Sequence, residues 1–241
     1  MTARRPAAPP TAAAAPPALR LSIVVPVLDE ADGIAATLDA LAAPRAAGHE
    51  VIVVDGGSGD ETLALSRPRA DAVIAGPRGR ARQMNAGAAH ATGDVLLFLH
   101  ADTRLPPFGV ERIGAAVAAG AAWGRFDVRI DGRPPMLVVV AALMNARSRL
   151  TGIATGDQAM FVRRELFERV GGFPDQPLME DIELSRRLCA CAPPACLRDR
   201  VVTSGRRWER HGVWRTTLLM WRLRWRYWRG APADELARAY R

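Results

Sequence analysis

The sequence predicts an α/β protein with a Rossmann-like, mostly parallel sheet and helices on both faces. Three observations carry this prediction. Short apolar runs alternate with segments of helical spacing through the first half of the chain. Several of the runs end abruptly in Asp or in His-x-Asp, which is typical of buried strands whose carboxyl ends hold ligands. A chain of 241 residues, 49% of them hydrophobic, is also long enough to bury a sizeable core.

Strands are predicted where apolar runs are short and bounded by turn residues. They are residues 21–25 (stopped by Pro26), 51–54, 72–75, 95–99, 123–130 (alternating, hence antiparallel), 159–162 and 198–203. Helices are predicted around Ile34, Leu38 and Leu41 and at residues 80–91, 137–150, 164–170 and 178–188. Ser58 or Asp60 is expected to cap the helix after the second strand.

Arginine is the one basic residue type, His aside, in this chain. The formal net charge is +8, with 33 basic residues and no lysine. The arginines are scattered, and no nucleic-acid-binding motif occurs, so nucleic acid is excluded as the expected partner. The three cysteines, Cys189, Cys191 and Cys196, lack the spacing of a zinc site and are interpreted as free thiols of a reducing compartment.

Composition divides the chain into three parts. Residues 1–19 are rich in Ala and Pro and predict a disordered tail. Residues 20–212 form the expected catalytic domain, and residues 213–241 a basic, Trp-rich helical segment. No apolar run reaches the length of a membrane span. We expect a cytoplasmic protein, with the inner face of the membrane as a second location.

Chemistry-bearing residues follow the ends of three predicted strands. Residues 26–30 begin a strand-to-helix turn whose backbone N–H groups suit a nucleotide. Asp55 either accepts a hydrogen bond from the imide of a base or is a turn aspartate. His100 and Asp102 lie on alternate residues, so both side chains point to one side and suit a divalent ion against a diphosphate. The alternative for this pair is a strand end with a polar turn.

Two further segments carry charge in a suggestive setting. Arg78 and Arg80 belong to a glycine-rich loop that enters a helix, which suits a phosphate, and Asn85 follows on that helix. The alternative is a solvated basic helix face. Glu180 and Asp181 lie among residues of the buried type, where a carboxylate is expensive without a partner or a task. They either take a proton from an acceptor or complement the helix dipole.

The order of these motifs resembles that of family-2 glycosyltransferases of the GT-A fold over about residues 21 to 210. Residues 24–30 resemble the opening nucleotide-binding strand, residues 55–58 the base-binding turn, and residues 82–87 the segment that usually reads A-R-N-x-G. His100-Ala101-Asp102 falls where the family carries D-x-D. Residues 156–161 and 171–173 resemble the acceptor-side segment, and Glu180-Asp181 the E-D pair. The F-L-H-A-D-T and G-R-R-W-E-R-H-G signatures resemble a small bacterial subgroup.

The resemblance implies an inverting transfer of a hexose from a UDP- or GDP-type sugar nucleotide to an acceptor hydroxyl. Asp181 would be the base, with Glu180 beside it. The residues implied for nucleotide binding are Pro26, Val27, Leu28, Glu30, Asp55, Arg78, Arg80, Asn85 and Ala101. Those implied on the acceptor side are Gly156, Asp157, Gln158, Arg207 and Trp208. The full Q-x-x-R-W of processive members is absent, so processivity is not inferred.

The resemblance also implies a divalent cation, Mn²⁺ or Mg²⁺, at Asp102. His100 replaces the first aspartate of D-x-D, and imidazole favours manganese over magnesium. His211 is either a further ligand or a surface histidine among arginines. Two other functions stay open: a sugar-nucleotide-binding protein without turnover, which the histidine keeps open, and a nucleotidyltransferase, whose usual lysine-containing signature is missing.

The segment 213–229 alternates tryptophans with arginines. Trp214, Leu218, Trp221 and Trp225 fall at helical spacing, as in a basic amphipathic helix that lies in a membrane interface. Such a helix suits a lipid-linked acceptor. The alternative is a helix packed on the catalytic domain or across a homodimer.

Overall fold

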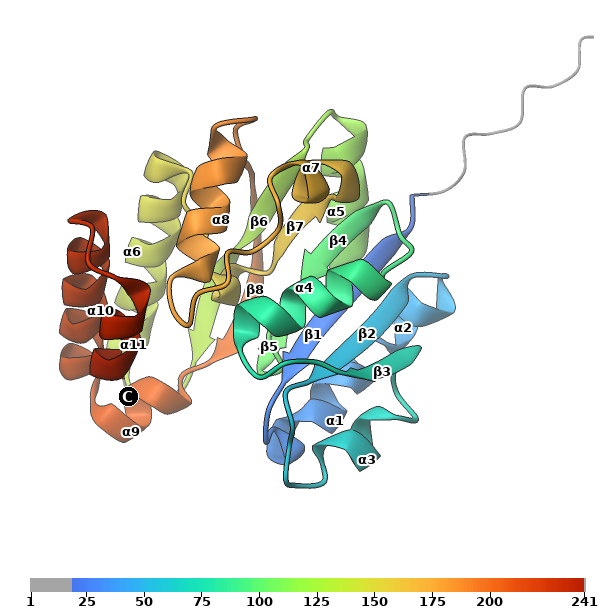
Figure 1. The fold of residues 1–241 in the computed structure, drawn as a ribbon, viewed down its shortest axis with the longest axis horizontal. Helices are drawn as coiled ribbons and strands as arrows, with labels where there is room; N and C mark the ends of the chain where they lie inside the picture. Colours follow the sequence, from blue (N-terminus) through green and yellow to red (C-terminus); the bar gives the residue numbers. More distant parts are fainter. Residues whose placement is uncertain (1–18, 241) are drawn as a thin grey trace, which may run out of the picture.

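The computed structural model describes residues 19–240, so the expected N-terminal tail lies outside the described residues apart from Leu19. The strands are β1 (Leu21–Val27), β2 (Glu50–Asp55), β3 (Ala72–Ala75), β4 (Val95–Phe98), β5 (Thr103–Arg104), β6 (Trp123–Asp131), β7 (Met160–Arg163) and β8 (Ala195–Ser204). They form one sheet in the order β3-β2-β1-β4-β7-β6-β8-β5 (Figure 1). The first four strands in this order are parallel, and β7 is antiparallel to β4.

Helices cover both faces of this sheet. They are α1 (Ala31–Asp39), α2 (Ala42–Ala46), α3 (Thr62–Ser66), α4 (Arg80–His90), α5 (Gly109–Ala118), α6 (Met136–Thr151), η1 (the 3-10 turn Gly156–Gln158), α7 (Arg164–Arg169), α8 (Glu180–Cys189), α9 (Arg206–His211), α10 (Val213–Trp228) and α11 (Ala233–Tyr240). Along β1, Ile23 and Val25 pack in the cluster that contains residues of α1, α5 and α6. Val24 packs in the cluster of α4, α7 and α8. The predicted α/β class with helices on both faces is therefore confirmed.

Two predicted strands differ in detail. Pro26 does not stop β1, which continues to Val27. Proline is tolerated there because β4 pairs with β1 only as far as Val24, so Pro26 has a strand neighbour only in β2. The expected antiparallel strand is antiparallel to β7 only at Trp123 and Gly124. Along the rest of its length β6 is parallel to β8.

The turn after β2 is built from side-chain bonds rather than from an N-cap. Thr62, the first residue of α3, donates its N–H to Asp60 Oδ1 at 2.9 Å. Ser58 instead receives the N–H of Asp29 at 3.0 Å. Asp29 returns the contact by accepting the N–H of Gly59 at 2.8 Å. The loops that follow β1 and β2 are thereby held together at the carboxyl edge of the sheet.

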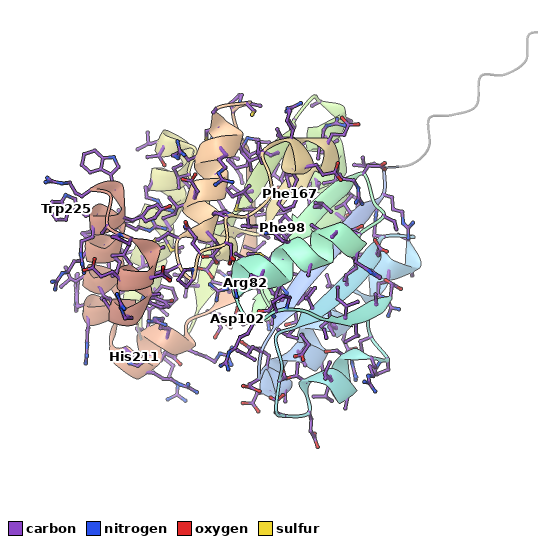
Figure 2. All side chains as sticks on the ribbon, in the orientation of Figure 1. Arg82, Phe98, Asp102, Phe167, His211 and Trp225 are labelled. Atoms are coloured by element: carbon purple, nitrogen blue, oxygen red, sulfur yellow. The ribbon has the colours of Figure 1, made fainter. Side chains whose placement is uncertain are left out.

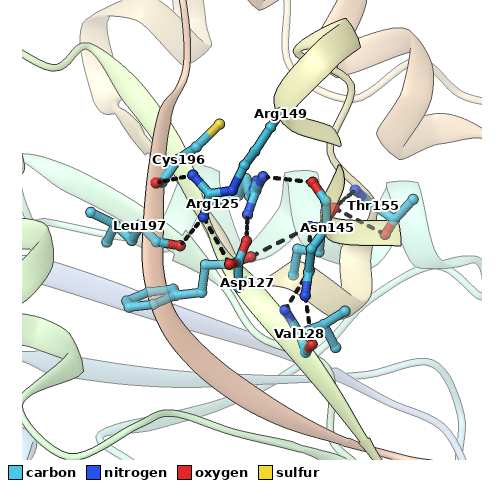
Figure 3. A network of polar contacts seen from close by, with 10 residues as sticks. Arg125, Asp127, Val128, Asn145, Arg149, Thr155, Cys196 and Leu197 are labelled. Atoms are coloured by element: carbon cyan, nitrogen blue, oxygen red, sulfur yellow. Dashed lines mark hydrogen bonds and ion pairs between the residues drawn. The ribbon is translucent and has the colours of Figure 1, made fainter. Parts of the chain in front are cut away.

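A buried polar network fastens α6 to β6 (Figure 3). Asn145 of α6 accepts the N–H of Val128 at 2.8 Å and donates to its carbonyl at 2.9 Å. Asp127 receives hydrogen bonds from Arg125 and Arg149. The Arg125 side chain is fully buried, so its charge depends on Asp127. This network fixes the helix that forms one wall of the site described below.

None of the helices in residues 19–240 combines the length and the apolar character required to span a bilayer.

Replacing Asp127 by Asn removes the anion that compensates buried Arg125. We expect the free energy of unfolding to fall by about 3–5 kcal/mol, as when one partner of a buried ion pair is lost. Urea denaturation followed by circular dichroism measures the change. Glu183→Gln is the matched control, since Glu183 pairs with the largely exposed Arg186 and should cost about 1 kcal/mol or less. An equal loss in both variants would contradict the assignment.

Candidate active site

A cavity of about 390 Å³ lies beyond the end of β4, walled by α6, α8, α9 and α10. Figure 2 places Asp102 near the centre of the molecule, between the parallel strands β1–β4 and the C-terminal helices. His211 lies on α9. The predicted site residues that line the cavity are Arg80, His100, Asp102, Gly156, Asp157, Glu180, Asp181, Arg207, Trp208 and His211. The chain thus brings residues from both halves of the sequence to one space.

The carboxylate of Asp181 is held by two backbone donors, one in η1 and one in the first turn of α8. Its Oδ2 accepts the N–H of Gly156 at 2.9 Å, and its Oδ1 accepts the N–H of Ile182 at 2.8 Å. Each oxygen of a carboxylate has capacity for about two hydrogen bonds, so each retains one free position. Met179, the residue before the first residue of α8, is in the left-handed region (φ 65°), which turns the chain sharply into the helix.

Glu180 is the buried neighbour of Asp181, only 4% exposed. Burial, together with the adjacent Asp181, raises the pKa of the Glu180 carboxyl above its ordinary value. The guanidinium of Arg80, at 3.9 Å, opposes this rise. As the pH falls, Glu180 therefore takes up a proton earlier than an ordinary glutamate does.

His100 contacts the 3-10 turn η1 rather than Asp102. Its Nδ1 lies 3.3 Å from Asp157 Oδ1. Its Nε2 is buried, finds no hydrogen-bond partner within residues 19–240, and lies 2.2 Å from where a Cβ on Gly156 would be. Burial alone would raise the pKa of the Asp157 carboxyl. The hydrogen bond and electrostatic attraction of His100, together with Arg80, outweigh burial and hold this pKa below its ordinary value.

Asp102 faces an arginine. Arg206 Nη2 lies 3.6 Å from Asp102 Oδ2 and 3.0 Å from Glu30 Oε2. Glu30 follows β1 and Arg206 begins α9. These two contacts therefore connect the loops after β1 and β4 with the C-terminal helices. The Asp102 side chain is 31% exposed and remains open to the cavity.

The three expected metal ligands, His100, Asp102 and His211, share the cavity but form no ready-made cage. Within residues 19–240, no group of three Asp, Glu, His or Cys side chains is close enough to hold a metal ion together. The ring nitrogens of His100 are directed at Asp157 and Gly156. The donor set therefore fits a cation held by Asp102 and completed by ligand oxygens, the usual arrangement at phosphate-binding sites.

Several predicted nucleotide-binding residues lie outside the cavity, at the carboxyl edge of β1 and β2. The Asp55 carboxylate accepts the N–H groups of Gly57 and Ser58 and the hydroxyl of Ser58. It therefore holds its own turn. The predicted site residues that do not line the cavity are Pro26, Val27, Leu28, Glu30, Asp55, Arg78, Asn85, Ala101 and Gln158.

Two of these side chains are occupied by contacts within the fold. Asn85 donates to the carbonyl of Phe173 at 2.8 Å and accepts the N–H of Phe173 at 2.9 Å. The amide expected to reach the nucleotide instead holds the loop before α8. Gln158 is fully buried, and its Oε1 accepts the N–H of Thr155 at 3.2 Å. Its position inside η1 supports the backbone that carries Gly156.

Arg206 and Tyr240 are among the cavity-lining residues that sequence reasoning missed. The sequence motif indicates Arg207 and not its neighbour Arg206, because only the folded chain shows which arginine of the pair reaches Asp102. Tyr240 lines the cavity from α11, and Arg207 stacks on its ring at 3.6 Å. No local motif marks Tyr240, since it reaches the site only through the packing of the last two helices.

Comparison with known sequences matches residues 22–171 to the model of glycosyl transferase family 2. An undecaprenyl-phosphate 4-deoxy-4-formamido-L-arabinose transferase of Klebsiella pneumoniae is 28% identical over 165 residues, 61% of this chain and 49% of that protein. The chain thus spans about half the length of this relative. An uncharacterized glycosyltransferase of Mycobacterium tuberculosis is 28% identical over 193 residues, 74% of this chain and 72% of that protein.

Solved structures share the fold. TarS of S. aureus, in complex with UDP-GlcNAc, superposes with a TM-score of 0.63 at 18% identity, covering 77% of this chain and 58% of that one. The mannosyltransferase PcManGT of Pyrobaculum calidifontis, in complex with GDP-Man and Mn²⁺, gives 0.56 at 29% identity, covering 76% and 56%. With the family model spanning more than half of the sequence, the chain belongs to glycosyl transferase family 2 and has the GT-A fold.

Proposed function

We propose that this glycosyltransferase moves a hexose from a UDP- or GDP-sugar to an acceptor hydroxyl with inversion at the anomeric carbon. One observation carries the proposal: Asp102, after β4, and Asp181, at the start of α8, line the same cavity. A carboxylate on each side leaves room for a diphosphate near one and an acceptor near the other. The complexes of TarS with UDP-GlcNAc and of PcManGT with GDP-Man support the donor class.

Asp181 is proposed as the general base. Its two backbone hydrogen bonds fix the plane of the carboxylate and leave a free position on each oxygen. An acceptor hydroxyl placed there loses its proton to Asp181 as its oxygen attacks the anomeric carbon. The bond from that carbon to the diphosphate breaks on the opposite face, so the configuration inverts.

The leaving diphosphate is proposed to meet the positive side of the cavity. Arg80 and Arg206 both line it, and the guanidinium fork matches phosphate oxygens. A divalent cation, Mn²⁺ or Mg²⁺, is proposed to bind at Asp102, with His211 as a second candidate ligand in the lining of the same cavity, and when bound it would supply charge that stabilises the leaving group. The complex of PcManGT with Mn²⁺ supports this choice.

The nucleotide is proposed to extend from the cavity toward the turn at Asp55. The ends of β1 and β2 and the residues after β4 lie at one edge of a parallel sheet, where ligands of such sheets bind. We also propose a lipid-linked acceptor and a site of action at the inner face of the membrane; the name of the Klebsiella pneumoniae relative supports the former. The division at residue 212 into a catalytic domain and a helical segment stays a proposal, with α10 and α11 supplying cavity residues.

Asp181→Asn keeps the size of the side chain and one hydrogen-bond acceptor but cannot take up a proton. We expect release of UDP or GDP from the sugar nucleotide to fall by about 10²-fold or more, with donor affinity nearly unchanged by calorimetry. Glu183→Gln, on the same helix but paired with Arg186 and Arg187 outside the cavity, should retain wild-type turnover. Equal losses of turnover and affinity in Asp181→Asn would assign it to binding instead.

Gly156→Ala places a Cβ only 2.2 Å from His100 Nε2, far closer than two such atoms can approach. Either the imidazole or the η1 backbone must shift, and the second choice moves the N–H that holds Asp181. We expect turnover to fall by about tenfold to a hundredfold, the usual effect of a 1 Å misplacement, with the melting temperature little changed. Gly114→Ala, where a Cβ meets nothing within 4 Å, is the control. Unchanged turnover in Gly156→Ala would show that this contact is irrelevant.

Asp102→Ala removes the carboxylate proposed to hold the cation. In a thermal-shift screen of UDP- and GDP-sugars, we expect the wild type to gain stability from the donor mainly when Mn²⁺ is present. Asp102→Ala should lose this manganese-dependent gain, whereas Asp32→Ala, at an exposed position of α1, should keep it. A full manganese-dependent gain in Asp102→Ala would place the cation elsewhere.

A further inference from the structure

Exposed large apolar side chains are concentrated on two neighbouring helices. Within residues 19–240, all of them except Phe108 belong to α6 or α10. Those on α6 are Val138, Val139, Leu143 and Leu150, and those on α10 are Trp214, Leu218, Trp221, Trp225 and Trp228. Scattered single apolar residues are normal on a protein surface, but a cluster of this size marks an interaction site.

The tryptophans of α10 do not lie on the side of the helix that packs against the protein core. The buried residues Thr216 and Leu223 point the other way, and Leu223 packs with Leu236 of α11 and with Leu178. The tryptophan side chains are between 58% and 81% exposed. Figure 2 shows Trp225 on the outer side of α10, away from the sheet. The helix does pack on the catalytic domain, one of the alternatives that the sequence left open, but it does so through the side of Thr216 and Leu223 and leaves the tryptophan stripe uncovered.

The apolar stripes of both helices border the cavity. Successive residues of an α-helix are 100° apart around its axis. Around α10, the apolar stripe therefore lies next to the positions of Thr217 and Arg224, which line the cavity. Around the axis of α6, Leu143 and Val139 likewise lie next to the positions of Met144 and Val140, which line the cavity. Trp221 belongs to both the stripe and the lining. Because α6 and α10 are neighbours (Figure 1), the two stripes flank the same opening.

The charge of this face is entirely positive. Neither α6 nor α10 contains an Asp or a Glu. Arg215, Arg222 and Arg229 follow the tryptophan stripe around α10 and are exposed. Within residues 19–240, Arg226 is the one arginine of α10 in an ion pair, with Glu235 of α11. Within the described residues, the arginines at the border of the stripe are therefore cations that pair with no carboxylate.

These features distinguish between two occupants. A second copy of the chain would set this cationic face against its own equivalent, because a two-fold interface is self-complementary, and neither helix offers an acid to pair with the arginines. An anionic bilayer supplies the missing charge, and tryptophan is the side chain that prefers the interface between headgroups and acyl chains.

We propose that the face formed by the exposed residues of α6 and α10 docks on an anionic membrane and brings the mouth of the catalytic cavity to the lipid surface. Docking in this orientation lets an acceptor anchored in the bilayer reach Asp181 without leaving it. The link to catalysis rests on the proposed function, whereas the docking itself does not.

Flotation of the full chain with vesicles tests the docking. We expect binding to vesicles of phosphatidylcholine mixed with phosphatidylglycerol and much weaker binding to phosphatidylcholine alone. The α10 variant (Trp214→Ser, Trp225→Ser and Trp228→Ser) and the α6 variant (Val139→Ser, Leu143→Ser and Leu150→Ser) should each lose about tenfold or more in partitioning. Phe108→Ser, the exposed apolar residue outside the face, should bind like the wild type.

Charge and geometry are tested separately. Arg215→Gln with Arg222→Gln should weaken binding to the anionic vesicles by about fivefold per arginine, corresponding to about 1 kcal/mol each. Brominated lipids should quench tryptophan fluorescence of the wild type more than that of the α10 variant. Undiminished vesicle binding by the α6 variant would overturn the two-helix face. Loss of a dimer in the variants by light scattering, with no vesicle binding by the wild type, would assign the face to a second copy.

The outcome is independent of the donor chemistry. None of the substituted residues lines the cavity, so turnover of a sugar nucleotide without vesicles should be the same in all variants. A chain that binds vesicles but turns over no sugar nucleotide would retain the docking and refute the proposed function. A chain that turns over sugar nucleotides but floats with neither kind of vesicle would support the proposed function and refute the docking.

Discussion

The site depends on the close approach of three segments at Gly156. Its N–H holds Asp181 of α8, and its Cα carries no side chain, which lets the imidazole of His100 lie directly against it. Since His100 also pairs with Asp157, the end of β4, the turn η1 and the start of α8 have one arrangement relative to each other. Glycine is required for this contact because a Cβ here would lie 2.2 Å from the imidazole and collide with it. The acidic side of the cavity exists because of this contact.

The C-terminal helices complete what the sheet alone leaves open. Arg206 joins Asp102 to Glu30, and Arg207 stacks on Tyr240 of the last helix. A small cluster of Leu178, Leu223 and Leu236 packs α10 and α11 against the segment that precedes α8. Residues 213–240 are therefore part of the wall of the site and also carry the tryptophan face, which is why we connect catalysis with membrane docking.

The sequence predicted the strands that are buried on both faces. In β2 and β4 every residue is apolar or a terminal acid, and short runs of this kind are typical of parallel strands buried on both faces. It missed α5, although Val110, Ile113 and Val117 have helical spacing, because the glycines and alanines between them weaken the pattern. It also missed β5, whose two residues are a strand only because β8 lies beside them.

Site residues were predictable where a motif carries them and unpredictable where packing selects among similar residues. Asp102 and Asp181 line one cavity, as the motif order implied. Asp55, expected at the same cleft, lies instead at the neighbouring strand end and is engaged by its own turn. The structural tasks of Asn85 and Gln158 follow from distant backbone groups, at Phe173 and Thr155, which no local pattern announces.

The central claim is that one cavity holds both the diphosphate and the base. The most direct measurement is a crystal structure of the chain with UDP and Mn²⁺, in which the anomalous signal of manganese locates the metal. The account predicts a manganese peak at Asp102, the diphosphate inside the cavity near Arg80 and Arg206, and the uracil directed toward Asp55. A diphosphate bound outside the cavity, away from Asp181, would contradict it.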